Sequence, residues 1–471
     1  MSWLRKDTIA ERRALQLARA GDHVGAFAHV TPVPLVVRSR LGLHLSVVED
    51  QSTRTRAERR CVALAHAELG DVERALRAAY DVSFAWRPAM RARLVASLAR
   101  WAPVEARNFA GRSASLLDCA LALRSCAPTE AERLFDMSRE GQTADRFAVE
   151  AILAALRGHH RHAREAANRM FAMFGQLPPL NASIDTPLSL EAFEFGGVDR
   201  PTSWTNRGPD VSIIMPVRNC ASSVGTAVRS ALGQTWRALE LVVIDDASED
   251  GTVENVRAAI ANDPRGRVVR RTTRGGTYTA RNAGLALATG EFVTFHDGDD
   301  WSHPERIARG MLPLLAEPGV MATQSRLVRL GADGLFVAPR VFPFVRANPS
   351  SLLFRRKQVV EALGGFDCVP FGADEEFSAR IVACFGPGSV RRISNLLAVC
   401  MESQSSLTGS AQTGVRSLQG NRDRIAYREA WHRRHLLAHR CLCRGDVQVA
   451  RPWRIDVRFG ANVSVPLAKA C

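Results

Sequence analysis

Two patterns of apolar residues divide the chain near residue 200. Residues 1–175 are rich in Ala, Leu, Arg and Glu, and their apolar positions recur at the spacing of an amphipathic helix. Beyond this region the pattern changes to short apolar runs typical of buried parallel strands, at Val211–Val217, Leu241–Ile244 and Glu291–Phe295. Helical patterns alternate with these runs at 222–235, 252–262 and 277–288. The alternation predicts a doubly wound α/β sheet that follows an all-α region.

The helical region carries a loose internal repeat. A turn precedes a helix-facing alanine at several places, namely at Ala26, Ala75, Ala106, Ala131 and Ala163. The separation of Ala75 from Ala106, and of Ala131 from Ala163, is close to the 34-residue period of tetratricopeptide helical hairpins. The pattern therefore resembles a degenerate tetratricopeptide-like solenoid. The other separations are uneven, so an irregular helical bundle is the alternative.

The stretch between the two patterns has the composition of a linker. It contains five prolines and a glycine pair, at Pro178, Pro179, Pro187, Pro201, Pro209 and Gly196-Gly197. We therefore expect a helical-repeat domain at 1–176, a linker at 177–209, an α/β domain at 210–415 and a C-terminal basic helix and tail at 416–471.

The charge is strongly basic, and it is carried by arginine. The chain has 63 Lys and Arg residues against 48 Asp and Glu residues, a net charge of +15, and only Lys6, Lys357 and Lys469 are lysines. Residues 1–200 hold 28 basic and 23 acidic residues, so most of the excess lies on residues 201–471. Arginine pairs bidentately with phosphates. No nucleic-acid reader motif is present and aromatic residues make up 7%, so we expect a phosphate-bearing small ligand and no nucleic acid.

The sequence predicts a cytoplasmic location, with peripheral association at the inner face of the membrane as the alternative. No uninterrupted apolar stretch reaches the length of a membrane span, and the start of the chain has no apolar signal-peptide core. The ten cysteines are scattered without a paired spacing, which is typical of reduced thiols.

Acidic residues follow two of the expected strands. The second strand runs into Asp245-Asp246, and the third into His296-Asp297-Gly298-Asp299-Asp300. Ligands of open α/β sheets bind beyond the carboxyl ends of the strands. Carboxylates that crowd together repel one another, and Mg²⁺ or Mn²⁺ with oxygen ligands is their natural partner. A solvated loop with helix-capping acids is the alternative.

Four ordered segments resemble the nucleotide-sugar-binding half of family 2 glycosyltransferases, which have the GT-A fold: Val211–Asn219, Val243–Thr252, Ala280–Gly284 and Phe295–Trp301. The resemblance continues to about residue 386 and does not include the helical region. It implies that Pro216 and Asn219 lie beside the nucleoside. Asp245 would bond the base or ribose, and Arg281 would reach the base or phosphate.

The same resemblance implies a metal site and a catalytic base. Asp297-Gly298-Asp299 matches the family's Asp-x-Asp motif, so Asp297 would face the ribose or metal and Asp299 would ligate Mn²⁺ or Mg²⁺. Asp374 aligns with the acidic residue that deprotonates the acceptor hydroxyl. Glu375 and Glu376 are the runners-up, and Ala373 stands where many relatives have Glu. Helix N-terminal acids without a catalytic role are the alternative.

A cluster of histidines and cysteines lies near the C-terminus, at His432, His435, His439, Cys441 and Cys443. Imidazole and thiolate suit Zn²⁺, but the intervening arginines repel a cation and the spacing fits no standard zinc module. A basic amphipathic helix from Arg422 to Arg440, packed on the sheet or touching an acidic surface, is the favoured interpretation.

These features predict a metal-dependent inverting glycosyltransferase that moves a sugar from a nucleotide-sugar, with UDP as the expected nucleotide. The resemblance implies a cell-surface glycan or lipid-linked acceptor. The family's Gln-x-x-Arg-Trp motif of processive synthases is absent, which favours single addition. The helical domain could bind a protein partner or the acceptor chain. A non-catalytic helical-repeat scaffold with a degenerate GT-A domain is the rival, and a nucleotidyltransferase is disfavoured because no glycine-rich, lysine-bearing loop follows the first strand.

Overall fold

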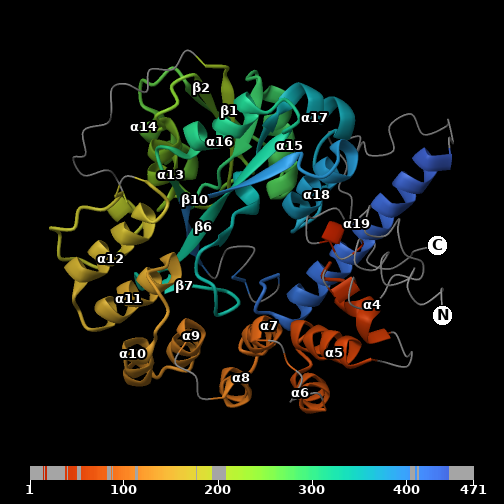
Figure 1. Cartoon of the computed structure of the whole chain (residues 1–471). Coiled ribbons are helices and arrows are strands. Elements are labelled where there is room, and N and C mark those ends of the chain that lie inside the picture. The colour runs from red at the N-terminus through yellow and green to blue at the C-terminus, as the bar shows by residue number, and fades with distance from the viewer. Residues whose placement is uncertain are drawn as a thin grey trace.

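The structure is a computed structural model of the chain, and a mixed sheet with flanking helices stands above an arc of helices (Figure 1). It describes residues 14, 16–18, 38–39, 41–49, 55–81, 86, 88–111, 115–176, 178–193, 208–403, 409–410 and 413–444. The predicted fold class, an α/β domain preceded by an all-α region, is confirmed.

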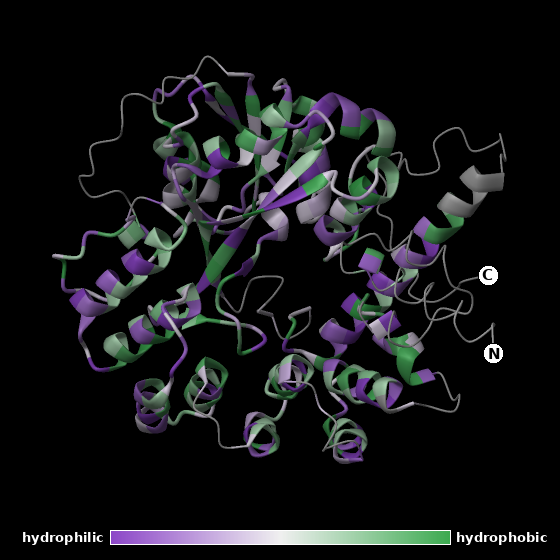
Figure 2. Ribbon diagram, in the orientation of Figure 1, coloured by the Kyte–Doolittle hydropathy of each residue, from purple (hydrophilic) through white to green (hydrophobic). Residues whose placement is uncertain are grey.

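The arc is built from short amphipathic helices that contact each other in consecutive pairs. Its helices are α4 (His44–Glu49), α5 (Arg56–Glu68), α6 (Val72–Tyr80), α7 (Pro88–Leu98), α8 (Pro103–Ala110), α9 (Leu116–Arg124), α10 (Pro128–Met137), α11 (Ala144–Leu156) and α12 (His160–Ala172). The contacting pairs are α5 with α6, α7 with α8, α9 with α10 and α11 with α12. Hydrophobic and hydrophilic residues alternate around these helices (Figure 2).

Local sequence explains where several of these helices begin. Thr55 and Ser115 each form a capping box, in which the hydroxyl accepts a backbone N–H and the third helical residue bonds back to the cap. The alanines of the predicted repeat pack inside the arc, with Ala75, Ala106 and Ala131 fully buried and Ala163 nearly so. Small residues at these places let paired helices approach closely. The tetratricopeptide-like assignment itself stays a prediction, and Ala26 lies outside the described residues.

One mixed sheet forms the centre of the second region. Its strands are β1 (Val211–Val217), β2 (Leu239–Asp245), β3 (Gly266–Arg270), β4 (Phe292–Phe295), β5 (Asp300–Ser302), β6 (Ala322–Gly331), β7 (Phe336–Val337), β8 (Arg346–Ala347), β9 (Leu353–Arg355) and β10 (Val390–Glu402). The order is β3-β2-β1-β4-β9-β6-β10-β5, and β7 and β8 also pair with β6. The first four strands are mutually parallel, so β1, β2 and β4 end at the same edge.

Helices cover both faces of the sheet, as the sequence pattern predicts. One face packs against α13 (Val224–Leu232), α14 (Thr252–Ile260) and α16 (Arg306–Ala316). The other packs against α15 (Thr277–Leu287), α17 (Arg356–Leu363) and α18 (Ala373–Phe385). Alternate residues of β1 supply both cores, with Ile213 facing the first layer and Ile214 the second. The strand β1 is therefore buried on both sides.

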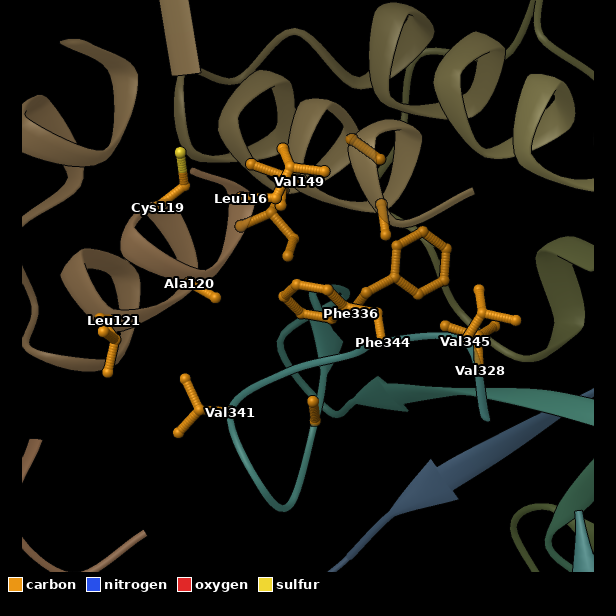
Figure 3. Packing of buried hydrophobic residues seen from close by; sticks show 14 of the residues in the cluster. Leu116, Cys119, Ala120, Leu121, Val149, Val328, Phe336, Val341, Phe344 and Val345 are labelled. Carbon is orange, nitrogen blue, oxygen red and sulfur yellow. The ribbon is translucent and has the colours of Figure 1, made fainter. Parts of the chain in front are cut away.

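The helical arc and the sheet share a continuous apolar core. The segment around β7 inserts Phe336, Val341 and Phe344 among residues of α9 and α11, including Leu116 and Val149 (Figure 3). Residues 178–193, within the expected linker, also join this core and end in the short helix η2 (Glu191–Phe193). The 3₁₀ turn η3 (Pro349–Ser351) follows β8 on the sheet side. The arc is thus packed onto the sheet and not merely tethered to it.

A long helix, α19 (Leu418–Arg444), closes the described part of the chain and contacts both α18 and α4. The predicted C-terminal helix is therefore present. Glu429 accepts hydrogen bonds from the backbone N–H groups of Leu45 (2.7 Å) and Ser46 (3.2 Å). Among the described helices, none combines the length and the apolar character that a membrane span requires.

Candidate active site

The loops after β1 and β2 are bonded to each other at the sheet edge. The backbone N–H of Asn219 donates to Ser248 Oγ (3.0 Å), and Asn219 Oδ1 accepts from the backbone N–H of Glu249 (2.9 Å). Asn219 takes a positive φ of 45°, a conformation that asparagine tolerates well. Pro216 is buried one residue before the end of β1, opposite Ile244. The two loops therefore form one rigid edge.

Two adjacent carboxylates at the end of β2 point to different partners. Asp245 is fully buried, accepts from Ser248 N (3.2 Å) and lies 3.4 Å from Arg270 Nε. Asp246 accepts from the backbone N–H groups of Gly275 (2.9 Å) and Gly276 (2.7 Å) and pairs with Arg271. Asp246 thus fixes the loop that leads into α15.

Arg281, on α15, places its guanidinium group beside the acidic loop. Its guanidinium is 2% exposed and donates to Asp297 Oδ1 (2.7 Å) and Ser350 Oγ (3.2 Å). The Arg281 guanidinium also lies over the ring of Tyr278, 5.4 Å from its centroid. Burial opposes the charge, but Asp297 more than compensates and raises the pKa of Arg281. Burial likewise works against the Asp297 carboxylate, yet Arg281 lowers the pKa of Asp297.

Two glycines let these elements approach. A Cβ at Gly284 would lie 2.3 Å from Ile214 Cγ2, so α15 packs directly on β1. A Cβ at Gly298 would lie 2.6 Å from Val217 Cγ1 and 3.2 Å from Cys220 Sγ. The central residue of Asp297-Gly298-Asp299 must therefore be small for the acidic loop to lie against the end of β1.

Among the described residues, the next carboxylates of this loop, Asp299 and Asp300, form no ion pair like that of Asp297 with Arg281, and Arg329 acts on them from farther away. Burial, and then the neighbouring Asp297, raises the pKa of Asp299 to about 6. Burial, followed by Asp299 and Asp297, raises the pKa of Asp300 well above its usual range. Asp300 accepts one backbone bond, from Met401 N (3.1 Å). The loop therefore concentrates more negative charge than the protein neutralises.

Asp374 lies in the first turn of α18 and is joined to the strand-end site through α15. Its Oδ1 accepts from the Tyr278 hydroxyl (3.1 Å) and from the backbone N–H of Glu375 (2.9 Å). Tyr278 in turn lies beneath the guanidinium of Arg281. A continuous set of contacts thus runs from Asp297 through Arg281 and Tyr278 to Asp374.

The two neighbouring acids are held by α19 instead. Glu375 is exposed and accepts from Arg428 (2.8 Å). Glu376 is fully buried and accepts from Arg380 (3.0 Å), Arg434 (3.0 Å) and His435 Nε2 (2.8 Å). Burial opposes this charge, but these partners lower the pKa of Glu376 to about 2. Of the three acids, only Asp374 has no cation within hydrogen-bond distance among the described residues.

The predicted site residues fall into two connected groups. Pro216, Asn219 and Asp245 meet at the ends of β1 and β2, and Arg281 with Asp297 lies one strand away. Tyr278 and Ser350 were not predicted, because an isolated tyrosine or serine carries no motif. The Gly275-Gly276 pair just before Tyr278 was the available signal, since it marks a loop that enters the site.

The C-terminal histidines do not gather around one point within the described residues. His435 bonds Glu376, while His432 Nδ1 bonds the backbone oxygen of Arg428 (2.7 Å). Burial outweighs Glu376 and lowers the pKa of His435, so the neutral ring donates from Nε2. The described residues hold no group of three or more potential metal ligands. The side chains of His439, Cys441 and Cys443 lie outside the described part.

The carboxylates lie beyond the ends of parallel strands, which is where open α/β proteins bind their ligands. Residues 212–373 match the model of the family described as Glycosyl transferase family 2. The chain therefore carries a family 2 glycosyltransferase domain. The match ends one residue before Asp374.

Curated relatives align over the same region. A hyaluronan synthase from Pasteurella multocida is 32% identical over 136 residues, 29% of this chain and 14% of that protein. An uncharacterized glycosyltransferase from Haemophilus influenzae is 34% identical over 113 residues, 24% of this chain and 45% of its own. A succinoglycan biosynthesis protein from Rhizobium meliloti is 40% identical over 126 residues, 27% of this chain and 35% of its own. The chain thus spans less than half the length of each of these relatives.

Solved structures superpose more weakly. TarS from S. aureus in complex with UDP-GlcNAc has a TM-score of 0.35 at 18% identity, covering 52% of this chain and 78% of that one. A mannosyltransferase from Pyrobaculum calidifontis has a TM-score of 0.35 at 19% identity, covering 66% and 93%. The family assignment rests on the sequence match and not on these superpositions.

Proposed function

We propose that the chain transfers a sugar from a nucleotide-sugar to an acceptor hydroxyl, with inversion at the anomeric carbon. The observation that carries this proposal is the connected set of side chains between the acidic loop and Asp374. Asp297 and Asp299 lie at one end, Asp374 lies at the other, and Arg281 with Tyr278 joins them. Such an arrangement provides one place for a leaving diphosphate and another for a base.

The nucleoside would lie at the joined ends of β1 and β2. Pro216 and Asn219 shape this edge, and Asp245 offers a carboxylate beside it. Arg281 is positioned to approach the base or a phosphate, and Asp297 to approach the ribose. We propose UDP as the nucleotide, which is what the resemblance to the family implies.

Asp299 and Asp297 would hold Mn²⁺ or Mg²⁺. The residues fit such an ion because burial and the neighbouring Asp297 raise the pKa of Asp299 to about 6, more than the charge of Arg329 offsets, and among the described residues no cation pairs directly with its carboxylate. Both residues supply the oxygen ligands that these cations prefer. When bound, the ion would neutralise the diphosphate that leaves.

Asp374 would remove the proton from the acceptor hydroxyl as the oxygen attacks the anomeric carbon. The Tyr278 hydroxyl donates to Asp374 Oδ1, which orients the carboxylate and leaves its other oxygen to accept the proton. The C–O bond to the diphosphate breaks on the opposite side of the anomeric carbon. One displacement of this kind inverts the configuration and needs no covalent intermediate with the protein.

The acceptor we propose is a cell-surface glycan or a lipid-linked precursor. The relatives named above include a hyaluronan synthase and a succinoglycan biosynthesis protein, which supports polysaccharide biosynthesis as the setting. A protein partner for the helical arc and a cytoplasmic location stay predictions from the sequence.

Nucleotide release by the full-length protein tests this function. We expect at least one of a panel of nucleotide-sugars, supplied with Mn²⁺, to release its nucleotide. Asp299→Asn should abolish this release, because it removes the carboxylate proposed as a metal ligand. The matched control is Glu249→Gln, since Glu249 is an exposed carboxylate at the same sheet edge. Absence of release with every donor, together with no binding of UDP and Mn²⁺, would favour the non-catalytic scaffold.

A further inference from the structure

A group of arginines lies around β6 and β10, in the half of the sheet away from the proposed nucleoside edge. Arg329 lies on β6, Arg346 forms β8 with Ala347, and Arg416 precedes α19. Arg124, the last residue of α9, approaches Arg416 from the helical arc. We call Arg124, Arg329, Arg346 and Arg416 the arginine cluster. Four distant segments of the chain contribute to it.

Strand register places the cluster close to Asp299. Asp300 is paired with Cys400 across β5 and β10, and Cys400 is paired with Arg329 across β10 and β6. Paired residues project to the same face of a sheet, and two strand spacings separate Asp300 from Arg329 by about 10 Å. Asp300 follows Asp299 directly. The side chain of Arg329 therefore projects from the same face of the sheet as Asp300, the last residue of the acidic loop.

Arg346 joins the same face from β8. It is paired with Leu327, two residues before Arg329 on β6, so both arginines project from one side of the sheet. The next turn of the chain, η3, carries Ser350, which bonds Arg281 in the proposed donor site. Arg346 is thus four residues from a side chain that contacts the site.

The cluster holds more positive charge than its surroundings neutralise. Glu402 is the shared anion, 3.3 Å from Arg329 and 3.7 Å from Arg416. The Arg346 side chain forms no ion pair with the described residues, whereas its backbone pairs with β6. The described residues offer no hydrogen-bond partner to the buried Nε atoms of Arg329, Arg346 and Arg416. Burial, and then Arg329 and Arg340, lowers the pKa of Arg346 to about 10, which reflects the missing anion.

Nearby acids fill this role for Arg329 alone: burial opposes its charge, but the carboxylates of Glu402, Asp300 and Asp299 help to raise the pKa of Arg329. Asp299 belongs to the proposed metal site, and Asp300 accepts from a backbone N–H group. Arg340 borders the cluster but lies 3.6 Å from Glu68, a carboxylate that also binds Arg100. Arg124, Arg346 and Arg416 share the carboxylate of Glu402, which also pairs with Arg329, and this leaves a demand for an external anion. Guanidinium forks bind phosphate and carboxylate oxygens in pairs.

We propose that the arginine cluster binds a phosphate or carboxylate group of the acceptor, so that the acceptor substrate is anionic. This inference rests on the proposed function, because it takes Asp299 to mark the position of the donor's diphosphate. The nucleoside edge lies at β1 and β2 and the cluster lies at β6, β8 and β10, while the acidic loop joins β4 to β5, on either side of β6 and β10. The sugar would pass across that loop to an acceptor held by its charge.

Anion binding to the full-length protein tests the inference directly. Titration calorimetry at constant ionic strength would use inorganic phosphate, glucuronate and, as a neutral probe, methyl glucoside. We expect saturable binding of phosphate or glucuronate at one site, and no binding of methyl glucoside. Phosphate and glucuronate serve as separate arms, and the tighter ligand identifies the group.

Two variants and one control locate the binding site. Arg346→Gln and Arg416→Gln should each weaken anion binding by about tenfold, because each removes a charged donor. The Arg416 side chain is 32% exposed and lies outside the sheet, so its variant keeps the test valid if Arg346→Gln fails to fold. Arg257→Gln, on the exposed face of α14, is the matched control and should bind as the wild type does. Equal loss in the control, or wild-type binding by both cluster variants, would overturn the inference.

A second titration separates the acceptor from the donor. With UDP and Mn²⁺ at saturation, the anion should still bind, because the acceptor position stays open. Loss of anion binding in the presence of UDP would assign the cluster to the donor's diphosphate and overturn the inference. If the protein neither binds UDP nor releases nucleotide while the cluster still binds phosphate, the proposed catalytic function fails and the anion site stands.

Discussion

Two runs of acidic residues, 297–300 and 374–376, look alike in sequence but are treated in opposite ways by the fold. Among the described residues, Asp297 is the one acid of the first run that forms an ion pair with an arginine, and the pKa of Asp299 is raised to about 6. In the second, Glu375 meets Arg428 and Glu376 is surrounded by cationic and hydrogen-bonding partners. The fold thus leaves one run in need of a cation and neutralises most of the other.

This contrast separates functional acids from structural ones. A carboxylate that the protein fully pairs has little left to offer a ligand, whereas one that is buried without a partner can bind a cation or a proton. Asp374 lies in the second run, but we place it with the functional acids. Its side-chain partner is the neutral Tyr278 hydroxyl and not a cation. Mutations of neighbouring acids should therefore give different phenotypes.

The largest expected effect is that of Asp374→Asn on sugar transfer. Loss of a general base costs 10²–10⁴-fold, so we expect the rate to fall by about a thousandfold. Donor binding should be unchanged, because the amide keeps a carbonyl oxygen that can accept the Tyr278 bond. Steady-state rates and UDP titrations measure the two effects. Glu375→Gln is the matched control in the same helical turn, and an equal loss there would reject Asp374 as the base.

Glu376→Gln should act on stability. The change leaves Arg380, Arg434 and His435 without their carboxylate, and breaking a buried ion pair in this way costs about 3 kcal/mol. Urea unfolding measures the loss. The exposed Glu254→Gln on α14 is the control and should change stability by less than about 0.5 kcal/mol. A variant as stable as the wild type would show that Glu376 does not hold α18 to α19.

Acid should remove the advantage of the wild type over Glu376→Gln. The folded-state pKa of Glu376 is about 2, below the ordinary value of 4.5, so its contribution is present above pH 4.5 and is lost as the pH falls toward 2. Other carboxylates titrate in both proteins and cancel in the difference. Urea midpoints of the pair between pH 6 and pH 3 should converge. A constant difference would mean that the charge of Glu376 is not what stabilises the contact.

The smallest expected effect is that of Gly298→Ala. The added Cβ would press on Val217 and Cys220, so the acidic loop must shift, at a cost of about 1–2 kcal/mol. We expect UDP binding in the presence of Mn²⁺ to weaken by about tenfold. Gly319→Ala is the control, because nothing lies within 4 Å of the added Cβ. Unchanged binding in Gly298→Ala would show that the loop does not contact the donor.

The strand-end site could be predicted from the sequence because its determinants are local. β1, β2 and β4 are short apolar runs; Asp245 ends β2, and Asn219 and Asp297 come two residues after β1 and β4. The predicted helices 222–235, 252–262 and 277–288 are confirmed as α13, α14 and α15 with shorter bounds. In each case the apolar residues of the element follow a single local pattern, which the sequence alone shows.

The rest depends on contacts between distant segments. β10 lacks a simple alternation, since its first half is partly exposed and its second half is buried, and so it was not predicted. The roles of Glu375 and Glu376 follow from Arg428 and His435, more than 50 residues away. The histidine pattern at 432 and 435 was compatible with a metal or a packed helix. His435 is accounted for by its hydrogen bond to Glu376. The sequence around His435 cannot predict this contact, because Glu376 lies far away in the chain.

The shared core has a consequence for how the chain can be divided. Phe336, Val341 and Phe344 leave the sheet and insert into the helical arc, and Asp145 of α11 accepts the backbone N–H of Phe344 (2.7 Å) and of Val345 (3.0 Å). An α/β fragment produced alone would present these apolar side chains to water and tend to aggregate. The arc therefore covers apolar surface that the α/β half cannot cover by itself, and we expect the two halves to be obtained in folded form only when they are expressed together.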